Sequence, residues 1–244
     1  MRETFGAALG RQRIAVAVAL VVGLLTAVVD LRAGEVGGPL TLVSLVPLAV
    51  FLVSAVRELR RPPSTAELRV DERSRAFFAP PRSGVSFLAV LVGFVLYRAI
   101  VIAVGPGRTG WDSLLATLFV ACLIVFTTVG WFRVPGVELT AEGIINRRLE
   151  RQWFVPWAAL DPQRPVGWRP GDRAISLPTV RPDLVRAGRG VGRDGTTVVT
   201  REVDAAPALI AGAIRHYLTH PGHRDAIGTG EEYARLRRQL VGED

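Results

Sequence analysis

The hydrophobic positions of this 244-residue chain gather into four long runs within its first 132 positions. Each run has about the length that a helix needs to cross the hydrocarbon core of a bilayer. Trp111 and Trp131 bracket the last run roughly one bilayer thickness apart, as interfacial anchors do. We therefore predict four transmembrane helices, at residues 14–31, 39–56, 85–104 and 113–132.

Beyond residue 133, polar and apolar positions alternate, as is typical of β-strands. Strands are expected at 137–140, 144–148, 152–155, 173–177 and 196–203, and Gly143 is expected to supply a positive φ in the first turn. Asp204 is placed to cap a helix at 205–217, and a last short helix is expected at 231–240. The pattern predicts a small α+β domain or β-barrel closed by a C-terminal helix, in residues 134–220. Residues 221–244 would follow as a polar tail with a short helix.

Residues 57–82 form a polar segment between the second and third hydrophobic runs, with seven arginines and four acidic residues. Loops with such an excess of positive charge lie on the cytoplasmic side of membranes. Within it, alternation at 67–70, turn residues at 71–74 and the segment 75–79, which contains Phe77 and Phe78, predict a β-hairpin. A lone hairpin is marginal in water, so we expect it to pack on the C-terminal domain.

The net charge of +8 is unevenly distributed. Residues 1–133 carry 14 arginines and 8 acidic residues, whereas residues 134–244 carry 16 and 14. The positive excess therefore lies beside the hydrophobic runs and forms no basic face for nucleic acid. With short outer loops, it predicts a multi-pass protein of the inner (plasma) membrane, with residues 1–133 as the membrane region and both termini cytoplasmic.

All 30 basic residues are arginine, and Asn146 is the one asparagine, as is typical of a GC-rich coding sequence such as that of an actinobacterium. The single cysteine, Cys122, lies within an apolar run, so the chain forms no internal disulfide and no cysteine-based metal site.

The spacing of His216, His220 and His223 raises the question of a metal site, because the first two share a helix face. However, Pro221 ends the helix before His223, and no glutamate occupies a metalloprotease position. We therefore predict imidazoles that interact with a helix C-terminus, with no metal and no other cofactor. With all three histidines in the C-terminal segment, no nucleophile–base pair is evident, and we expect no enzymatic activity.

The segments VELTAEGI (137–144) and FVPWAAL (154–160), joined by an arginine-bearing turn, resemble the opening of bacterial PH domains of the low-molecular-weight antigen type. The matching residues are Leu139, Glu142, Gly143, Arg147, Arg148, Val155, Pro156 and Trp157. The resemblance implies a PH-like cytoplasmic domain and carries no catalytic residues.

Arg147, Arg148 and Arg151 cluster on one predicted turn. Arginine binds phosphate through two parallel hydrogen bonds, and PH-like barrels can hold such turns against anionic head groups. The alternative is a solvated turn in which Glu150 offsets the charge. We predict a non-catalytic, membrane-anchored module that binds membrane lipids, a protein partner or a second copy of itself.

Arg98 is the one charge well inside a predicted span, and such residues are candidates for function. It lies toward the outer face, where it can reach the interface or pair with Asp30 or Asp112. A structural pair with Asp30 is the prediction. The alternative is a small transporter or channel component with Arg98 in its pathway.

Overall fold

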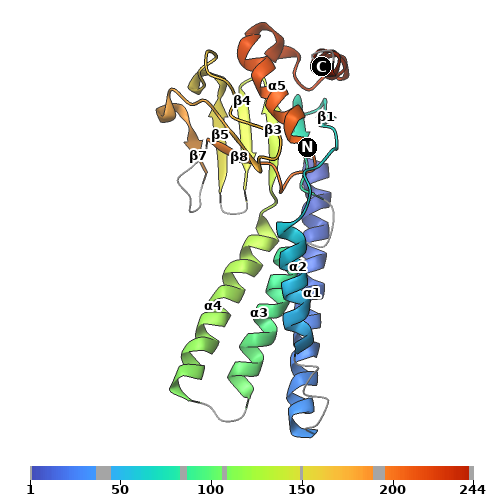
Figure 1. The fold of residues 1–244 in the computed structure, drawn as a ribbon, viewed down its shortest axis with the longest axis vertical. Helices are drawn as coiled ribbons and strands as arrows, with labels where there is room; N and C mark the ends of the chain where they lie inside the picture. The colour runs from blue at the N-terminus through green and yellow to red at the C-terminus, as the bar shows by residue number, and fades with distance from the viewer. Residues whose placement is uncertain are drawn as a thin grey trace. The chain divides into compact units, whose positions relative to one another are not determined.

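The computed structural model describes residues 2–36, 45–82, 87–105, 109–148, 151–188 and 196–241. The chain divides into two compact units, drawn in Figure 1. The helical unit comprises Leu9–Arg61 and Gly84–Phe132. The sheet unit comprises Met1–Ala8, Pro62–Ser83 and Arg133–Asp244, so it is assembled from segments that are far apart in the sequence.

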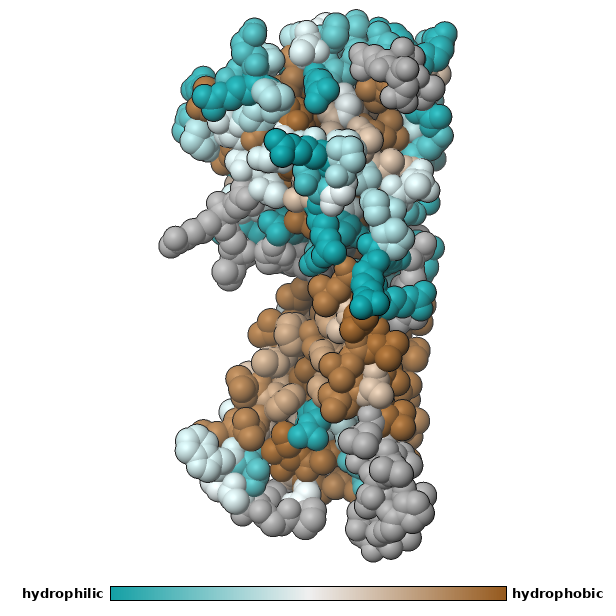
Figure 2. All heavy atoms as spheres, in the orientation of Figure 1, coloured by the Kyte–Doolittle hydropathy of each residue, from teal (hydrophilic) through white to brown (hydrophobic). Residues whose placement is uncertain are grey.

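Four helices occupy the N-terminal half: α1 (Arg2–Val36), α2 (Leu45–Leu59), α3 (Phe87–Val104) and α4 (Gly110–Phe132). Among the described residues, three segments are long and apolar enough to cross a membrane, namely Ala8–Arg32, Phe87–Val104 and Gly110–Phe132. Figure 2 shows the hydrophobic surface over these helices. Their leucine and valine side chains are exposed in large number, which suits contact with lipid.

The second predicted span, residues 39–56, is described only from residue 45 onward. Helix α2 has 15 residues, or about 22 Å of helix, which is shorter than the hydrocarbon core. Residues 37–44 lie outside the described part of the chain. Three helices of spanning length make this a membrane protein, and the four-span arrangement stays a prediction.

Small residues let α1 and α3 approach closely. Ala19, Gly23 and Ala27 recur at four-residue spacing on α1, and Ala27 is fully buried. A Cβ atom added to Gly23 would collide with the backbone of Gly93 in α3, and one added to Gly93 would lie 2.8 Å from the carbonyl oxygen of Ala19. Such spacing of small residues is how membrane helices pack without a hydrophobic driving force.

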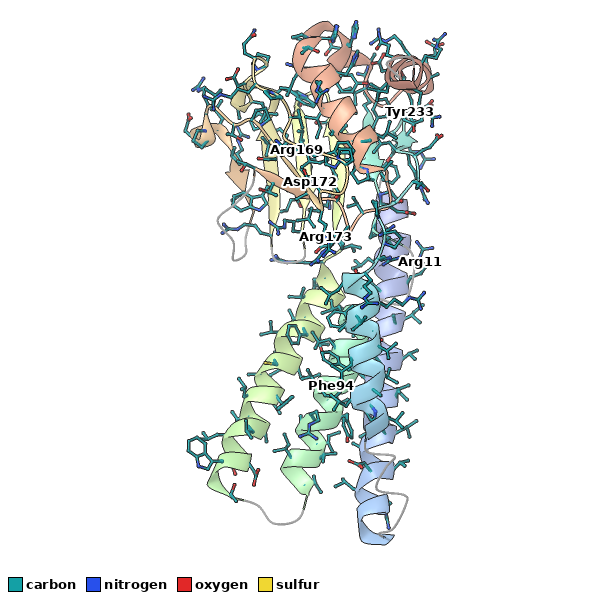
Figure 3. All side chains as sticks on the ribbon, in the orientation of Figure 1. Arg11, Phe94, Arg169, Asp172, Arg173 and Tyr233 are labelled. Carbon is teal, nitrogen blue, oxygen red and sulfur yellow. The ribbon has the colours of Figure 1, made fainter. Side chains whose placement is uncertain are left out.

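Aromatic rings join α2 to α3. The ring of Phe51 stacks on that of Phe94, labelled in Figure 3, with centroids 4.7 Å apart. Phe51 also contacts Phe87 at 5.6 Å. These contacts bury aromatic surface between the two helices and fix their rotation about their own axes.

The main sheet has six antiparallel strands in the order β1-β2-β3-β4-β5-β7. Their bounds are β1 (Arg69–Asp71), β2 (Ala76–Ala79), β3 (Gly136–Thr140), β4 (Gly143–Arg147), β5 (Gln152–Pro156) and β7 (Arg186–Ala187). A second sheet pairs β6 (Ala174–Ser176) with β8 (Thr197–Val199). Short 3-10 helices occupy Trp157–Ala159 (η2) and Pro182–Leu184 (η3). Strand β7 was not predicted, because both of its residues are exposed and show no alternation.

The predicted hairpin is present as β1 and β2, and its packing on the C-terminal domain is confirmed. Strand β2 pairs with β3, and Phe77 lies opposite Leu139. Further backbone bonds join the flanks of the hairpin to the segment before α5. The amide of Ala206 donates to the carbonyl of Ala66 at 2.7 Å, and that of Asp204 donates to Pro80 at 2.6 Å.

Helices α5 (Pro207–Thr219), η4 (Pro221–Ala226) and α6 (Gly230–Val241) complete the sheet unit. Phe77, Trp157 and Tyr217 meet at its centre. The ring centroid of Tyr217 lies 6.3 Å from that of Phe77 and 6.2 Å from that of Trp157. The segment predicted as a polar tail also contributes to this core, because Ile227 and Leu236 are buried. Tyr233 of α6, labelled in Figure 3, lies 5.5 Å from Phe77, centroid to centroid.

Two local predictions were wrong. Asp204 does not cap α5, which begins at Pro207 after Ala206; its carboxylate instead accepts a hydrogen bond from Ser64 Oγ at 2.8 Å. Gly143 has no positive φ. It is required instead by close approach, since a Cβ there would lie 2.7 Å from the Cα of Pro156.

We expect Gly93→Ala to lower the free energy of unfolding by about 1–3 kcal/mol, because the added methyl meets backbone that cannot move aside. Gly10→Ala is the matched control on α1, where an added Cβ has no atom within 4 Å. The same change there should be neutral or stabilising through helix propensity. Thermal unfolding of both variants in detergent micelles checks this, and equal effects would contradict the packing described.

Candidate functional site

The three predicted arginines lie at one end of the main sheet. Arg147 is the last residue of β4 and lies opposite Gln152, the first residue of β5. The amide of Arg148 donates to the carbonyl of Arg151 at 2.9 Å, which closes the turn between the strands. Residues 149–150, and Glu150 with them, lie outside the described part of the chain.

Arg147 is held by a buried carboxylate. Its Nε lies 2.7 Å from Oε1 of Glu138 on β3, and the Glu138 side chain is fully buried. Burial raises the pKa of Glu138, and the Arg147 guanidinium opposes that rise. The sequence analysis did not single out Glu138, because a lone acidic residue in a strand is normally solvated and its partner Arg147 is contributed by the neighbouring strand.

Arg151 is held differently. Its guanidinium carbon lies 5.1 Å from the ring centroid of Trp153, within the range of a cation–π interaction. Trp153 is buried and lies opposite Ala187 of β7. At the same end of the sheet, the Asn146 side-chain amide donates to the carbonyl of Thr197 at 2.9 Å. We refer to Arg147, Arg148 and Arg151 together as the arginine turn. Contacts with neighbouring strands therefore hold this turn in place.

The three histidines form a second cluster. The ring of His216 in α5 lies 4.6 Å from that of His220 and 5.1 Å from that of His223 in η4, centroid to centroid, and the rings are nearly parallel. Nε2 of His216 lies 3.0 Å from Nδ1 of His223. One ring nitrogen from each residue lies within 4.8 Å of the other two.

The predicted end of the helix before His223 is confirmed, but it does not separate His223 from the other two imidazoles. Pro221 does follow the end of α5, but it also begins η4, and that tight turn returns His223 to the ring of His216. Helical spacing alone could not show this. The Pro221-Gly222 turn signal was visible in the sequence, but the direction in which the chain leaves it was not.

His216 is deeply placed, with 8% of its surface exposed. Burial lowers its pKa to about 4, and the neighbouring His220 and His223 act in the same direction. Its imidazole is therefore neutral at pH 7. The exposed His220 is oriented by its own contacts, since its Nδ1 lies 3.1 Å from the carbonyl of His216 and 2.9 Å from Thr219 Oγ1.

A buried polar network adjoins this cluster. The Tyr217 hydroxyl donates to Oε1 of Glu232 at 2.9 Å, and Arg235 pairs with the other Glu232 oxygen at 2.7 Å. Burial raises the pKa of Tyr217, and the hydrogen bond to Glu232 adds to the rise. The carboxylate of Glu232 is thereby satisfied from two sides although it is buried.

The structure describes the surroundings of Asp30 and Asp112, the two predicted partners of Arg98. Asp30 of α1 accepts a hydrogen bond from the hydroxyl of Tyr97 in α3 at 2.9 Å. Asp112, the other candidate partner of Arg98, accepts from the backbone amide and hydroxyl of Thr109 at the start of α4. Both carboxylates therefore have roles in holding or capping helices, and Arg98 lies next to the first of these pairs along α3.

Comparison of the chain with protein-family models, with curated proteins and with solved structures found no match. The likeness to bacterial PH domains therefore rests on the residues quoted from the sequence.

We expect Glu138→Gln to change how stability depends on pH. Burial raises the folded-state pKa of Glu138 above its unfolded value. Protonation of Glu138 therefore adds to the free energy of unfolding, and this addition is fully present below about pH 4.5. That contribution is lost as pH rises through the folded-state pKa, because the unfolded chain releases the proton more readily. The difference in unfolding free energy between the wild type and Glu138→Gln should therefore shift in favour of the variant as pH rises.

Denaturant unfolding in micelles at a series of pH values from 4 upward measures this difference. Glu231→Gln is the control, since Glu231 is exposed in the first turn of α6. A wild type and a Glu138→Gln variant with parallel pH profiles would contradict the buried state of Glu138.

Proposed function

We propose that this chain is a multi-pass inner-membrane protein whose sheet unit is a PH-like, non-catalytic binding module for anionic lipid head groups. The observation that carries the proposal is the position of the arginine turn. Arg147, Arg148 and Arg151 lie at the end of the main sheet where β3 begins, since Arg147 is opposite Gly136.

Chain connectivity limits how far this turn can lie from the bilayer. Gly136 follows Phe132, the last residue of α4, by four positions, so their Cα atoms are at most about 14 Å apart. Arg147 lies directly opposite Gly136 in the ladder, which adds about 5 Å. A turn tethered within roughly 20 Å of a helix end is held where anionic head groups concentrate.

The topology is compatible with a PH-like fold. Five strands, β1 to β5, follow one another as an antiparallel meander, and α5 packs its Ile210 and Ile214 against the sheet's core. The two-stranded sheet of β6 and β8 supplies a second layer of strands, with Ile175 and Val198 in the same core. These features support the family resemblance of the 137–160 segment.

Several contacts support placing the sheet unit and the N-terminal end of α1 on one side of the membrane. Strands β2 and β3 flank the α3–α4 hairpin in sequence and pair with each other. The Gln12 side chain donates to the carbonyl of Gly130, and Arg13 Nε donates to that of Trp131 at 3.0 Å. The start of the α1 span therefore meets the end of α4. Positive-inside bias assigns this side, with both termini, to the cytoplasm.

We expect Arg148→Gln/Arg151→Gln to weaken retention of phosphatidylglycerol by the full-length protein roughly tenfold or more, since each basic residue near a surface contributes about 1 kcal/mol. Retention of phosphatidylcholine should not change. Native mass spectrometry of the detergent-solubilised chain, titrated with each lipid, measures both. Arg147 is left in place because it pairs with buried Glu138.

The control is Arg169→Gln/Arg215→Gln, which removes the same charge from exposed positions in other elements; Arg169 is labelled in Figure 3. Equal losses in both double variants would leave only a general charge effect and would reject the arginine turn as the site. Unchanged lipid binding together with loss of a co-purifying protein would favour a protein partner instead. A fragment 134–244 is unsuitable for this experiment, since it lacks β1 and β2.

For orientation, we expect a reporter that is active only in the periplasm to stay inactive when fused after Asp244, because the arginine-rich segments hold that end in the cytoplasm. A fusion within the connection between α3 and α4 should be active and serves as the control. Activity of the C-terminal fusion would reverse the proposed topology.

A further inference from the structure

We propose that His216, His220 and His223 form a binding site for a single divalent transition-metal ion of the zinc class. The site lies where α5 gives way to η4 and is separate from the arginine turn. The juxtaposition of three imidazoles carries the proposal: His216 lies in α5, His220 caps its C-terminal end, and His223 lies in η4.

The spacing of the ring nitrogens suits a shared ion. Ligand nitrogens bound at about 2.0–2.1 Å to one tetrahedral or octahedral ion lie about 3 Å apart. His216 Nε2 and His223 Nδ1 already have this separation, at 3.0 Å. All three ligand atoms fall within 4.8 Å of one another, so the third nitrogen is already near the other two.

Contacts with backbone carbonyls orient the residues of the site in a way that suits metal binding. A ligating imidazole commonly uses its other ring nitrogen to contact a backbone carbonyl, which fixes its tautomer and orientation. His220 Nδ1 lies 3.1 Å from the carbonyl of His216, and this leaves Nε2 of His220 for the ion. The loop that carries His223 is also held, because Arg224 Nε donates to the carbonyl of Tyr217 at 2.7 Å.

The three imidazole ligands determine which class of metal ion the site can bind. Three imidazoles and no thiolate suit Zn²⁺, Cu²⁺ or Ni²⁺ and disfavour Ca²⁺ and Mg²⁺, which prefer oxygen ligands. Three protein ligands also leave one or more coordination positions for water or for a group from outside the chain.

Titration of Zn²⁺ into the untagged full-length protein in micelles tests the site by calorimetry. The chain contains three histidines and one cysteine, so a polyhistidine tag must be avoided. We expect about one ion per chain, with a Kd that rises at least tenfold in His220→Ala and in His223→Ala. Cys122→Ser and Arg215→Ala are controls that should keep wild-type affinity.

Two results would overturn the proposal. One is the absence of binding by the wild type up to about 100 µM Zn²⁺; the histidines would then form only a hydrogen-bonded stack. The other is binding that survives both histidine substitutions in folded protein.

Electron paramagnetic resonance of the wild type loaded with one equivalent of Cu²⁺ gives an answer even if a variant fails to fold. Hyperfine coupling to several imidazole nitrogens is expected. A spectrum without nitrogen coupling would reject the site whatever the variants show.

Discussion

Strand β2 has to pair with strand β3 for the sheet unit to exist, although α3 and α4 lie between them in the sequence. The two helices must therefore run out and back, so that Ala79 and Val137 can pair in one ladder. Phe77 and Leu139, opposite each other in this ladder, are both buried in the core. Without the hairpin, β3 would become an open edge with an exposed apolar face. Folding of the sheet is thus coupled to return of the helical hairpin.

Buried polar groups fix the geometry around that core. Glu138 and Glu232 are both buried, and each is paired with an arginine at 2.7 Å. An uncompensated carboxylate at either place would be costly, so each pair ties its neighbours to one arrangement. Glu138 holds the arginine turn at one end of the sheet. Glu232, through Tyr217, joins α5 to α6.

Local signals were sufficient for much of the fold. Alternation and turn residues predicted β3, β4, β5 and β6 with bounds within one or two residues, and the apolar runs predicted the three helices of spanning length. These features depend on neighbouring residues alone. Short β7 was missed for the opposite reason, since its two exposed residues are a strand only because β5 lies beside them. Asp204 was assigned to the wrong partner because Ser64 lies 140 positions away.

By itself, the sequence determined a membrane protein with a strand-rich C-terminal region and an arginine-bearing turn, because periodicity and charge are written along the chain. Only the tertiary structure decided which distant groups meet. It paired Asp30 with Tyr97, anchored Arg147 on Glu138, and brought His223 back to His216. The physical reason is common to all three. A contact between two elements depends on the direction in which the chain continues after each turn and on the space available between neighbouring elements. Sequence spacing does not encode either quantity.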